Sequence, residues 1–385
     1  MIKEPEIQYI EKFICRDSLK TNDPYDIWKT KLGIQVKKLY YSKPKLGIIP
    51  AAVLTIYDHY INNFIRIGYK KQEYPIVRAQ AASSLLNLYN KTNNKTYLTQ
   101  ARKHIDWLLL NSSRNYSGFC WGTGFKIVIG KDLVYDKETP FTTNTIYVLE
   151  ALDEYYKVTK EKRILNVIKS IYEFYEKDII VLYEDHKILI TSYGPFKDRV
   201  VTNAVSYTMF AYSIFYNYID EKEYIYKKVN KMFQFIKSVQ NEDGSWLYAP
   251  HDENSFIDCF HSCFVLKNIY KSNLNIKLDG CQELIKLGYQ YIKKSFYDKH
   301  SGLYKRFVKT NKSSIIKFDL YDNAELVYLA KLLDDIELVQ SLKKNIRSSF
   351  IVNDEIYSVI DLFGFKRNKN TLRWAISPYI LAISK

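Results

Sequence analysis

The sequence predicts an all-α protein folded as a single (α/α)6 toroid, a ring of six helical hairpins. The first observation behind this prediction is a repeat of polar residues at similar points of apolar helical segments. The gaps between them are 64, 59, 58, 62 and 54 residues, and the positions are Gln80, Asn144, Asn203, His261, Asn323 and Ser377. A repeat of about sixty residues with helical patterns indicates stacked two-helix units, and six such pairs close a ring. We expect these polar residues to converge on one central cavity.

Two further observations concern helix type and loop length. Segment 221–240 has one apolar stripe, whereas 139–157 and 199–218 are apolar on nearly all sides. A one-sided helix lies at the surface and an all-round apolar helix is enclosed, so the sequence predicts an outer ring around an inner ring. Links from outer to inner helices are long and the return links are short. We expect the long loops, with small β-hairpins, to gather on one face and build the pocket.

Along the chain, residues 1–45 are predicted to be a lead-in segment, irregular or partly helical, and 46–385 the toroid domain. Pro50 and Pro75 suit the first turns of helices, where a missing N–H costs nothing. Strand-like runs occur at 179–190 and 303–318. The six expected hairpins are 50–67 with 75–90, 95–111 with 139–157, 160–176 with 199–218, 221–240 with 256–270, 281–297 with 318–334, and 335–349 with 371–384.

Composition limits the classes of protein. Five cysteines without paired spacing fit a reducing compartment. The N-terminus lacks the layout of a secretory signal, and no apolar run approaches the ~18–20 residues that cross a bilayer, so we expect a cytoplasmic protein without a transmembrane segment. The net charge of +15 fits either a solvated lysine-rich surface or attraction to a polyanion or an anionic membrane face. Nucleic acid is disfavoured because the lysines are dispersed and no nucleic-acid motif is present.

The strongest local pattern is the loop 240–248 followed by the helix that contains Asp258 and His261. Residues at i and i+3 share one helix face, so Asp258 could orient and polarise His261 for acid–base catalysis. Alternatively, Asp258 caps the helix and His261 is bonded within the ring. Cys259 and Cys263 flank the histidine, but positions i and i+2 point to nearly opposite sides, so we predict no metal site and no cofactor.

Other candidate site residues lie in the long loops and at the starts of the inner helices. Tyr193 is a candidate acid or base, and Arg199 and Arg373 are candidates for holding a carboxylate or phosphate. Trp121 and Trp246 could stack on sugar rings, or they could be loop anchors. Asp322, together with Asp258, could supply the two facing carboxylates that a glycosidase needs. Asn144 and Asn203 are predicted to bind substrate because the repeat places them at the cavity.

At these residues the chain resembles known toroids. Gln240 to Trp246 matches the Gln-x-x-Asp-Gly-Ser-Trp turn of terpenoid cyclase and prenyltransferase toroids, but the Asp-x-Asp-Asp motif of squalene-type cyclases is absent. A closer resemblance is to a six-hairpin glycosidase-like family encoded in bacterial and archaeal polysaccharide gene clusters. The segments that carry it are 23–26, 120–122, 139–145, 243–248, 257–261 and 373–374.

This resemblance implies a place in polysaccharide metabolism without a defined activity. Two departures matter: Ser262-Cys263 replaces Thr-Gly, and 318–322 lacks the histidine of an Ile-Asp-Ile-His-like stretch. Our first hypothesis is a hydrolase, lyase or epimerase acting on an acidic glycan or its precursor. The alternative is a non-catalytic glycan-binding or assembly module of a polysaccharide synthesis complex, with peripheral contact to that machinery.

Overall fold

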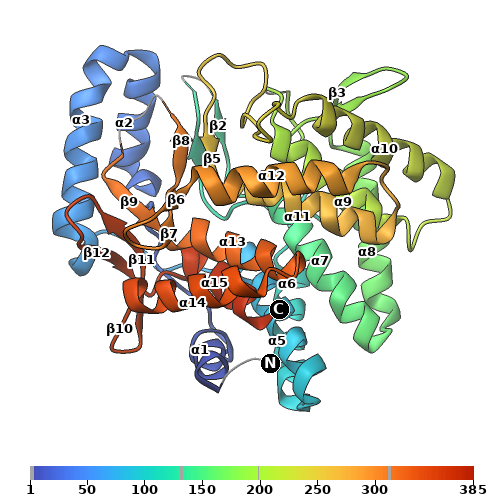
Figure 1. Ribbon diagram of the computed structural model, residues 1–385, viewed down its shortest axis with the longest axis horizontal. Helices are drawn as coiled ribbons and strands as arrows, with labels where there is room; N and C mark the ends of the chain where they lie inside the picture. Colours follow the sequence, from blue (N-terminus) through green and yellow to red (C-terminus); the bar gives the residue numbers. More distant parts are fainter. Residues whose placement is uncertain (1–3, 131–132, 198, 311–313) are drawn as a thin grey trace.

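Six inner helices form a closed ring in the computed structural model, which describes residues 4–130, 133–197, 199–310 and 314–385 (Figure 1). Each inner helix packs against the next, and the last packs against the first. In chain order the inner helices are α5 (Pro75–Thr92), α7 (Thr142–Thr159), α9 (Thr202–Phe215), α11 (Cys259–Asn275), α13 (Leu320–Leu332) and α15 (Ser377–Ser384). The predicted (α/α)6 toroid is confirmed.

Outer helices cover this ring with their apolar stripes. In α8, for example, Ile164, Ile168 and Ile171 are buried on one face. Such a stripe packs on the ring because the opposite face is charged and solvated. The outer helices are α1 (Glu4–Ile14), α6 (Lys95–Leu110), α8 (Lys162–Lys177), α10 (Lys222–Ser238), α12 (Cys281–Ser295) and α14 (Ile336–Phe350). Hairpins two to six therefore agree with the predicted pairs to within a few residues.

The first predicted hairpin is wrong in its outer member. The first part of segment 50–67 belongs to α3 (Pro44–Ile56), in which Pro50 lies inside the helix and not in its first turn as predicted. Helix α3 packs against α2 (Lys31–Ser42) and leaves much of its apolar surface exposed. The outer position beside α15 and α5 is taken by α1, whose Ile10 and Ile14 are fully buried. Apolar content alone could not separate a buried helix from an exposed one. We propose that the ring domain includes α1 rather than beginning at residue 46.

The long loops carry short antiparallel strands, as predicted. Two of these pairings matter for the site: β5 pairs with β8, and β9 pairs with β11. The strands are β1 (Ile127–Val128), β2 (Val134–Tyr135), β3 (Val181–Glu184), β4 (Leu189–Thr191), β5 (Ile257–Asp258), β6 (Tyr297–Asp298), β7 (Leu303–Tyr304), β8 (Phe307–Lys309), β9 (Ile316–Asp319), β10 (Ile351–Val352), β11 (Glu355–Asp361) and β12 (Lys366–Lys369). The remaining helical segments are η1 (Asp26–Lys29), η2 (Tyr57–Asn62), α4 (Asn63–Ile65) and η3 (Leu372–Ile376).

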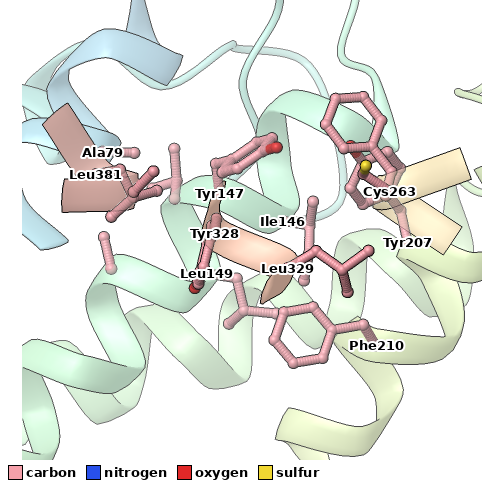
Figure 2. Packing of buried hydrophobic residues seen from close by; sticks show 14 of the residues in the cluster. Ala79, Ile146, Tyr147, Leu149, Tyr207, Phe210, Cys263, Tyr328, Leu329 and Leu381 are labelled. Atoms are coloured by element: carbon pink, nitrogen blue, oxygen red, sulfur yellow. The ribbon is translucent and has the colours of Figure 1, made fainter. Parts of the chain in front are cut away.

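The middle of the ring is a packed core. Figure 2 shows side chains from all six inner helices meeting there, among them Tyr147 and Tyr207, whose ring centroids lie 6.1 Å apart. Lys271 of α11 also pairs with Glu150 of α7 at 2.7 Å, which joins two inner helices that are not neighbours in the ring. Aromatic rings and ion pairs therefore fill the centre of the toroid. A cavity with room for about one water remains beside Tyr147, Glu150 and Lys271, and none of the six polar repeat positions lines it, so their expected convergence on one central cavity is not observed.

Candidate functional site

Asp258 and His261 form a dyad at the start of α11. Asp258 ends strand β5 and is the N-cap of the helix, and its Oδ1 accepts the backbone N–H of His261 at 3.0 Å. The Nδ1 of His261 lies 2.9 Å from Oδ1 and 2.8 Å from Oδ2 of the same carboxylate. This contact favours the tautomer with the proton on Nδ1, which leaves Nε2 free to accept a proton. The cap and the predicted polarising contact are therefore present together.

The dyad lines a small cavity at the loop end of the ring. The cavity offers about 10 Å³ to the centre of a water molecule, which is room for about one water. It is bounded by α9, α11 and the loop between α10 and β5. Its lining residues are Thr202, Asn203, Trp246, Leu247, Tyr248, Asp258, His261, Ser262 and Val265. Four predicted site residues, Asn203, Trp246, Asp258 and His261, are thus brought together.

Aromatic side chains cover the histidine. The Tyr248 ring lies 4.6 Å from the His261 ring and stacks on Phe256 at 4.7 Å. Arg199 lies over Tyr248 at 5.3 Å and pairs with Asp252 at 3.2 Å, joining the two loops that make the cover. Arg199 is half exposed, so it is at the rim as predicted. The His261 side chain is 19% exposed, so this cover is partial and part of the ring is open to solvent.

Tyr193 lies beside the cavity. Its hydroxyl is close to the side chains of Asn203, Thr143 and Tyr248. Burial raises the pKa of Tyr193, so the hydroxyl is protonated at neutral pH and is a weaker acid than an exposed tyrosine. The role of Tyr193 as an acid or a base stays a prediction.

Asp322 does not face Asp258 across the ring. It lies on the adjacent inner helix, where its Oδ1 accepts the N–H of Phe260 at 3.0 Å. Both carboxyl groups therefore serve the N-terminus of α11, whose free N–H groups need acceptors. Asp322 is fully buried, and burial raises its pKa well above the ordinary value. The arrangement of two facing carboxylates predicted for a glycosidase is therefore not formed by this pair.

Arg306 lies at the mouth of the ring, by which we mean the loop end around the starts of α11, α13 and η3, and no sequence pattern predicts it. Its Nη1 donates to Asp319 Oδ2 and to Tyr25 Oη, both at 3.3 Å, and its guanidinium lies 5.0 Å from the Phe260 ring. The indole N–H of Trp374 donates to the same Asp319 oxygen at 2.8 Å. Arg306 comes from the link between β7 and β8, where only the pairing of β8 with β5 brings it to the site. No local motif marks it.

Arg373 is held by an ion pair and is not free at the rim. Its Nε pairs with Asp23, which is fully buried and also lies 3.5 Å from Lys29 Nζ. Burial would raise the pKa of Asp23, but the positive charges of Arg373 and Lys29 lower it to about 2. Substrate binding by Arg373 stays a prediction, and in this structure its guanidinium is paired with a carboxylate of the lead-in segment.

The two predicted sugar-stacking tryptophans differ. Trp121 has no exposed surface, and its Nε1 donates to the Leu108 carbonyl at 2.9 Å, so it anchors a loop to α6 and cannot stack on a ligand. Trp246 is also anchored, through the Ile236 carbonyl at 3.0 Å, but its ring borders the cavity. Asn144 is buried and is not among the residues that line the cavity. The burial of Trp121 and Asn144 follows from the tight packing of α7 and its loop.

Within the part of the chain that the structure describes, no three histidine, cysteine or carboxylate side chains are arranged to hold a metal ion. The five cysteines are free thiols, and Cys259 and Cys263 are fully buried. Over the same residues, no helix combines the length and the apolar character needed to cross a bilayer.

No protein-family model matches the sequence, and no curated protein is detectably similar to it. The fold is similar to that of a sugar epimerase from a ruminal bacterium, 15% identical, with a TM-score of 0.62 over 81% of this chain and 87% of that chain. It is similar to the cellobiose 2-epimerase of Spirochaeta thermophila, 11% identical, with a TM-score of 0.62 over 89% and 96%. A GH76 α-mannanase of Bacteroides thetaiotaomicron is 11% identical, with a TM-score of 0.57 over 94% and 97%. Likeness at this identity establishes the shared toroid fold.

Proposed function

We propose that the protein is a carbohydrate-active enzyme in which His261 transfers a proton. The observation that carries the proposal is the His261–Asp258 dyad, placed at the loop end of the toroid with its Nε2 unbonded to any described side chain. The similar structures support the substrate class, because their names include epimerases, a polysaccharide lyase, a mannanase and a mannose isomerase. These activities are those of the similar proteins, and for this chain they support the proposal that its substrate is a carbohydrate.

The chemistry that suits this dyad is abstraction of a proton next to a carbonyl or carboxylate. His261 Nε2 would take the proton from the sugar carbon, and the Asp258 carboxylate would stabilise the imidazolium that forms. Return of a proton from water to the opposite face of the carbon gives an epimer, and His261 then releases the abstracted proton to solvent. Loss of the group on the next carbon, with a proton donated by Tyr193, gives a lyase product. Hydrolysis by two carboxylates is disfavoured because Asp258 is occupied by His261 and Asp322 is buried.

We further propose that the ligand is an acidic sugar or its activated precursor. Arg199 stands half exposed at the rim, and a cation beside the reacting carbon would neutralise a carboxylate and acidify the adjacent C–H. A role in polysaccharide synthesis is supported by the sequence motifs described above, and a cytoplasmic location by the five free cysteines.

The test is deuterium incorporation. The protein is incubated in D2O with a panel of uronic acids, neutral disaccharides and nucleotide sugars, and NMR follows loss of each carbon-bound proton. We expect exchange at one sugar carbon by the wild type, and a loss of about 10²–10⁴-fold in His261→Gln. Exchange that persists in His261→Gln would refute the assignment of the base.

One observation favours a second function, that of a non-catalytic glycan-binding module. The cavity at His261 admits about one water, and Tyr248 and Phe256 cover it. If this cover never opens, the protein would bind a glycan at the rim without reacting. Saturation-transfer NMR with the same panel distinguishes the two: binding without deuterium incorporation would favour the module.

A further inference from the structure

One edge of the molecule presents an apolar surface outside the ring. We call it the α2–α4 patch; it comprises the exposed side chains of residues 31–71 and the turn 362–365. Of 27 large hydrophobic side chains exposed among the described residues, 12 lie between residues 32 and 67 and three more in the turn. They are aliphatic or aromatic and many are more than half exposed: Leu32, Tyr40, Tyr41, Leu46, Ile48, Ile49, Val53, Ile56, Ile61, Phe64, Ile65, Ile67, Leu362, Phe363 and Phe365. This concentration is far larger than scattered exposure would give.

The patch is also strongly basic. Residues 31–71 contain eight basic side chains and one acidic side chain, a net charge of +7 out of the protein's +15. The acidic residue, Asp58, is buried and bonded to the hydroxyl of Tyr69. Six of the lysines are exposed, and none of these six has a carboxylate partner among the described residues: Lys31, Lys38, Lys43, Lys45, Lys70 and Lys71. The patch therefore combines exposed apolar side chains with exposed cationic ones.

The patch is held rigidly on the ring. A carbon added at Gly47 would lie 2.3 Å from Tyr40 Cα, so α3 packs backbone to backbone on α2. His59 Nε2 lies 3.1 Å from Asp361 Oδ2, and Asn63 Nδ2 donates to Asn368 Oδ1 at 2.9 Å, which joins the end of the helices to strands β11 and β12. Figure 1 shows α2 and α3 side by side at the edge of the molecule, beside β12. Their apolar side chains are thus presented outward by fixed contacts.

We propose that the α2–α4 patch docks on the surface of an anionic lipid bilayer. Apolar side chains enter the boundary between headgroups and acyl chains, and surrounding lysines contact anionic headgroups. A second copy of this chain is a poor occupant, because a symmetric contact would bring two segments of charge +7 together. Helix α3 has 13 residues, about 20 Å in length, and is too short to span about 30 Å of hydrocarbon. It lies on the membrane rather than across it.

The test is flotation of the full chain with vesicles of phosphatidylcholine alone and of phosphatidylcholine with about one third phosphatidylglycerol. We expect binding to the anionic vesicles that weakens with salt, and at least about tenfold weaker binding to neutral ones. Ile49→Glu with Val53→Glu should reduce binding at least about tenfold, because two charges would enter the apolar boundary. The exposed Leu110 and Leu274 lie elsewhere, and Leu110→Glu with Leu274→Glu is the matched control, expected to bind within about twofold of the wild type.

Circular dichroism confirms that both double variants are folded, and sedimentation velocity measures their oligomeric state. Absent binding to anionic vesicles, or unchanged binding of the Ile49→Glu, Val53→Glu variant, would overturn the proposal. So would a wild-type dimer that this variant converts to a monomer, which would assign the patch to self-association. Equal losses in the test and control variants would also overturn it, because binding would then follow net charge and not this surface.

Discussion

Asp258 has two separable contacts, and replacing it by asparagine separates them. The side chain caps α11 through the N–H of His261 and also receives the Nδ1 proton of its ring. Asparagine caps helices about as well as aspartate, so Asp258→Asn should retain the cap. It has no negative charge to stabilise an imidazolium, and its amide can turn its NH2 to Nδ1 and reverse the tautomer. We therefore expect the variant to fold normally and to lose proton transfer.

The magnitudes follow from these contacts. Asp258→Ala loses a cap, about 1 kcal/mol, and a buried hydrogen bond, about another 1 kcal/mol, so its free energy of unfolding should fall by about 2 kcal/mol. Asp258→Asn should lose less than about 1 kcal/mol, because only the charge assistance of one bond disappears. Deuterium incorporation should fall about 10²–10⁴-fold in both variants.

Three measurements check this reasoning: urea unfolding, deuterium incorporation, and the ¹⁵N shifts of the His261 ring, which report the tautomer without a substrate. The wild type should show a proton on Nδ1. An Asp258→Asn protein that is as unstable as Asp258→Ala and exchanges deuterium as the wild type does would mean that Asp258 acts only as a cap. A wild-type ring protonated on Nε2 alone would refute the proposed base directly.

Further predictions concern buried charges and an anchor. The pKa of Asp23 is lowered from 3.8 to about 2, worth about 2 kcal/mol, so this stability is present above about pH 4 and is lost as pH falls towards 2. Arg373→Gln should remove the part that Arg373 contributes, with Lys29 still beside Asp23, as urea unfolding across that range would measure. Asp322 has a raised pKa in the folded protein. Its contribution to the free energy of unfolding is therefore present below the pKa of the unfolded chain, and it falls by about 1.4 kcal/mol per pH unit as the pH rises towards the pKa of the folded protein. Asp322→Asn should therefore be more stable than the wild type at pH 7 and not at pH 4, measured by the same unfolding. Trp121→Phe should cost about 2 kcal/mol through its lost hydrogen bond and the cavity left, while titrated glycan binding stays unchanged.

Much of the ring could be predicted from the sequence because its signals are local. The amphipathic stripes of the outer helices and the all-round apolar inner helices differ in ways that the sequence displays, so five hairpins were placed correctly. The first hairpin failed for a physical reason. The apolar run in 50–67 has the composition of a buried helix, yet it lies at the surface, and only tertiary contacts show that the short α1 fills the outer position.

The sequence could predict only the part of the site that lies within the N-terminus of a single helix. Asp258 and His261 are three residues apart, so their contact follows from helix geometry. Trp121 and Trp246 stand in similar glycine-flanked loops, and the sequence could not tell that one is wholly buried and the other borders the cavity. Arg306 reaches Asp319 through strand pairing, which no local pattern encodes.

Residues of the lead-in segment contact the mouth of the ring directly, as the starts of the inner helices do. Asp23 pairs with Arg373 across 350 residues of sequence, and the Tyr25 hydroxyl receives a bond from Arg306. The same segment continues into α2 and then α3, which carry the α2–α4 patch. Because Asp23 is fully buried and charged, the segment is fixed at the mouth by ion pairs that cannot break without leaving an uncompensated charge. The α2–α4 patch, which we propose as a docking surface, and the cavity at Asp258 and His261 are thus joined through this one segment. Binding of the patch to a membrane would therefore hold the mouth of the ring in a fixed orientation to that membrane.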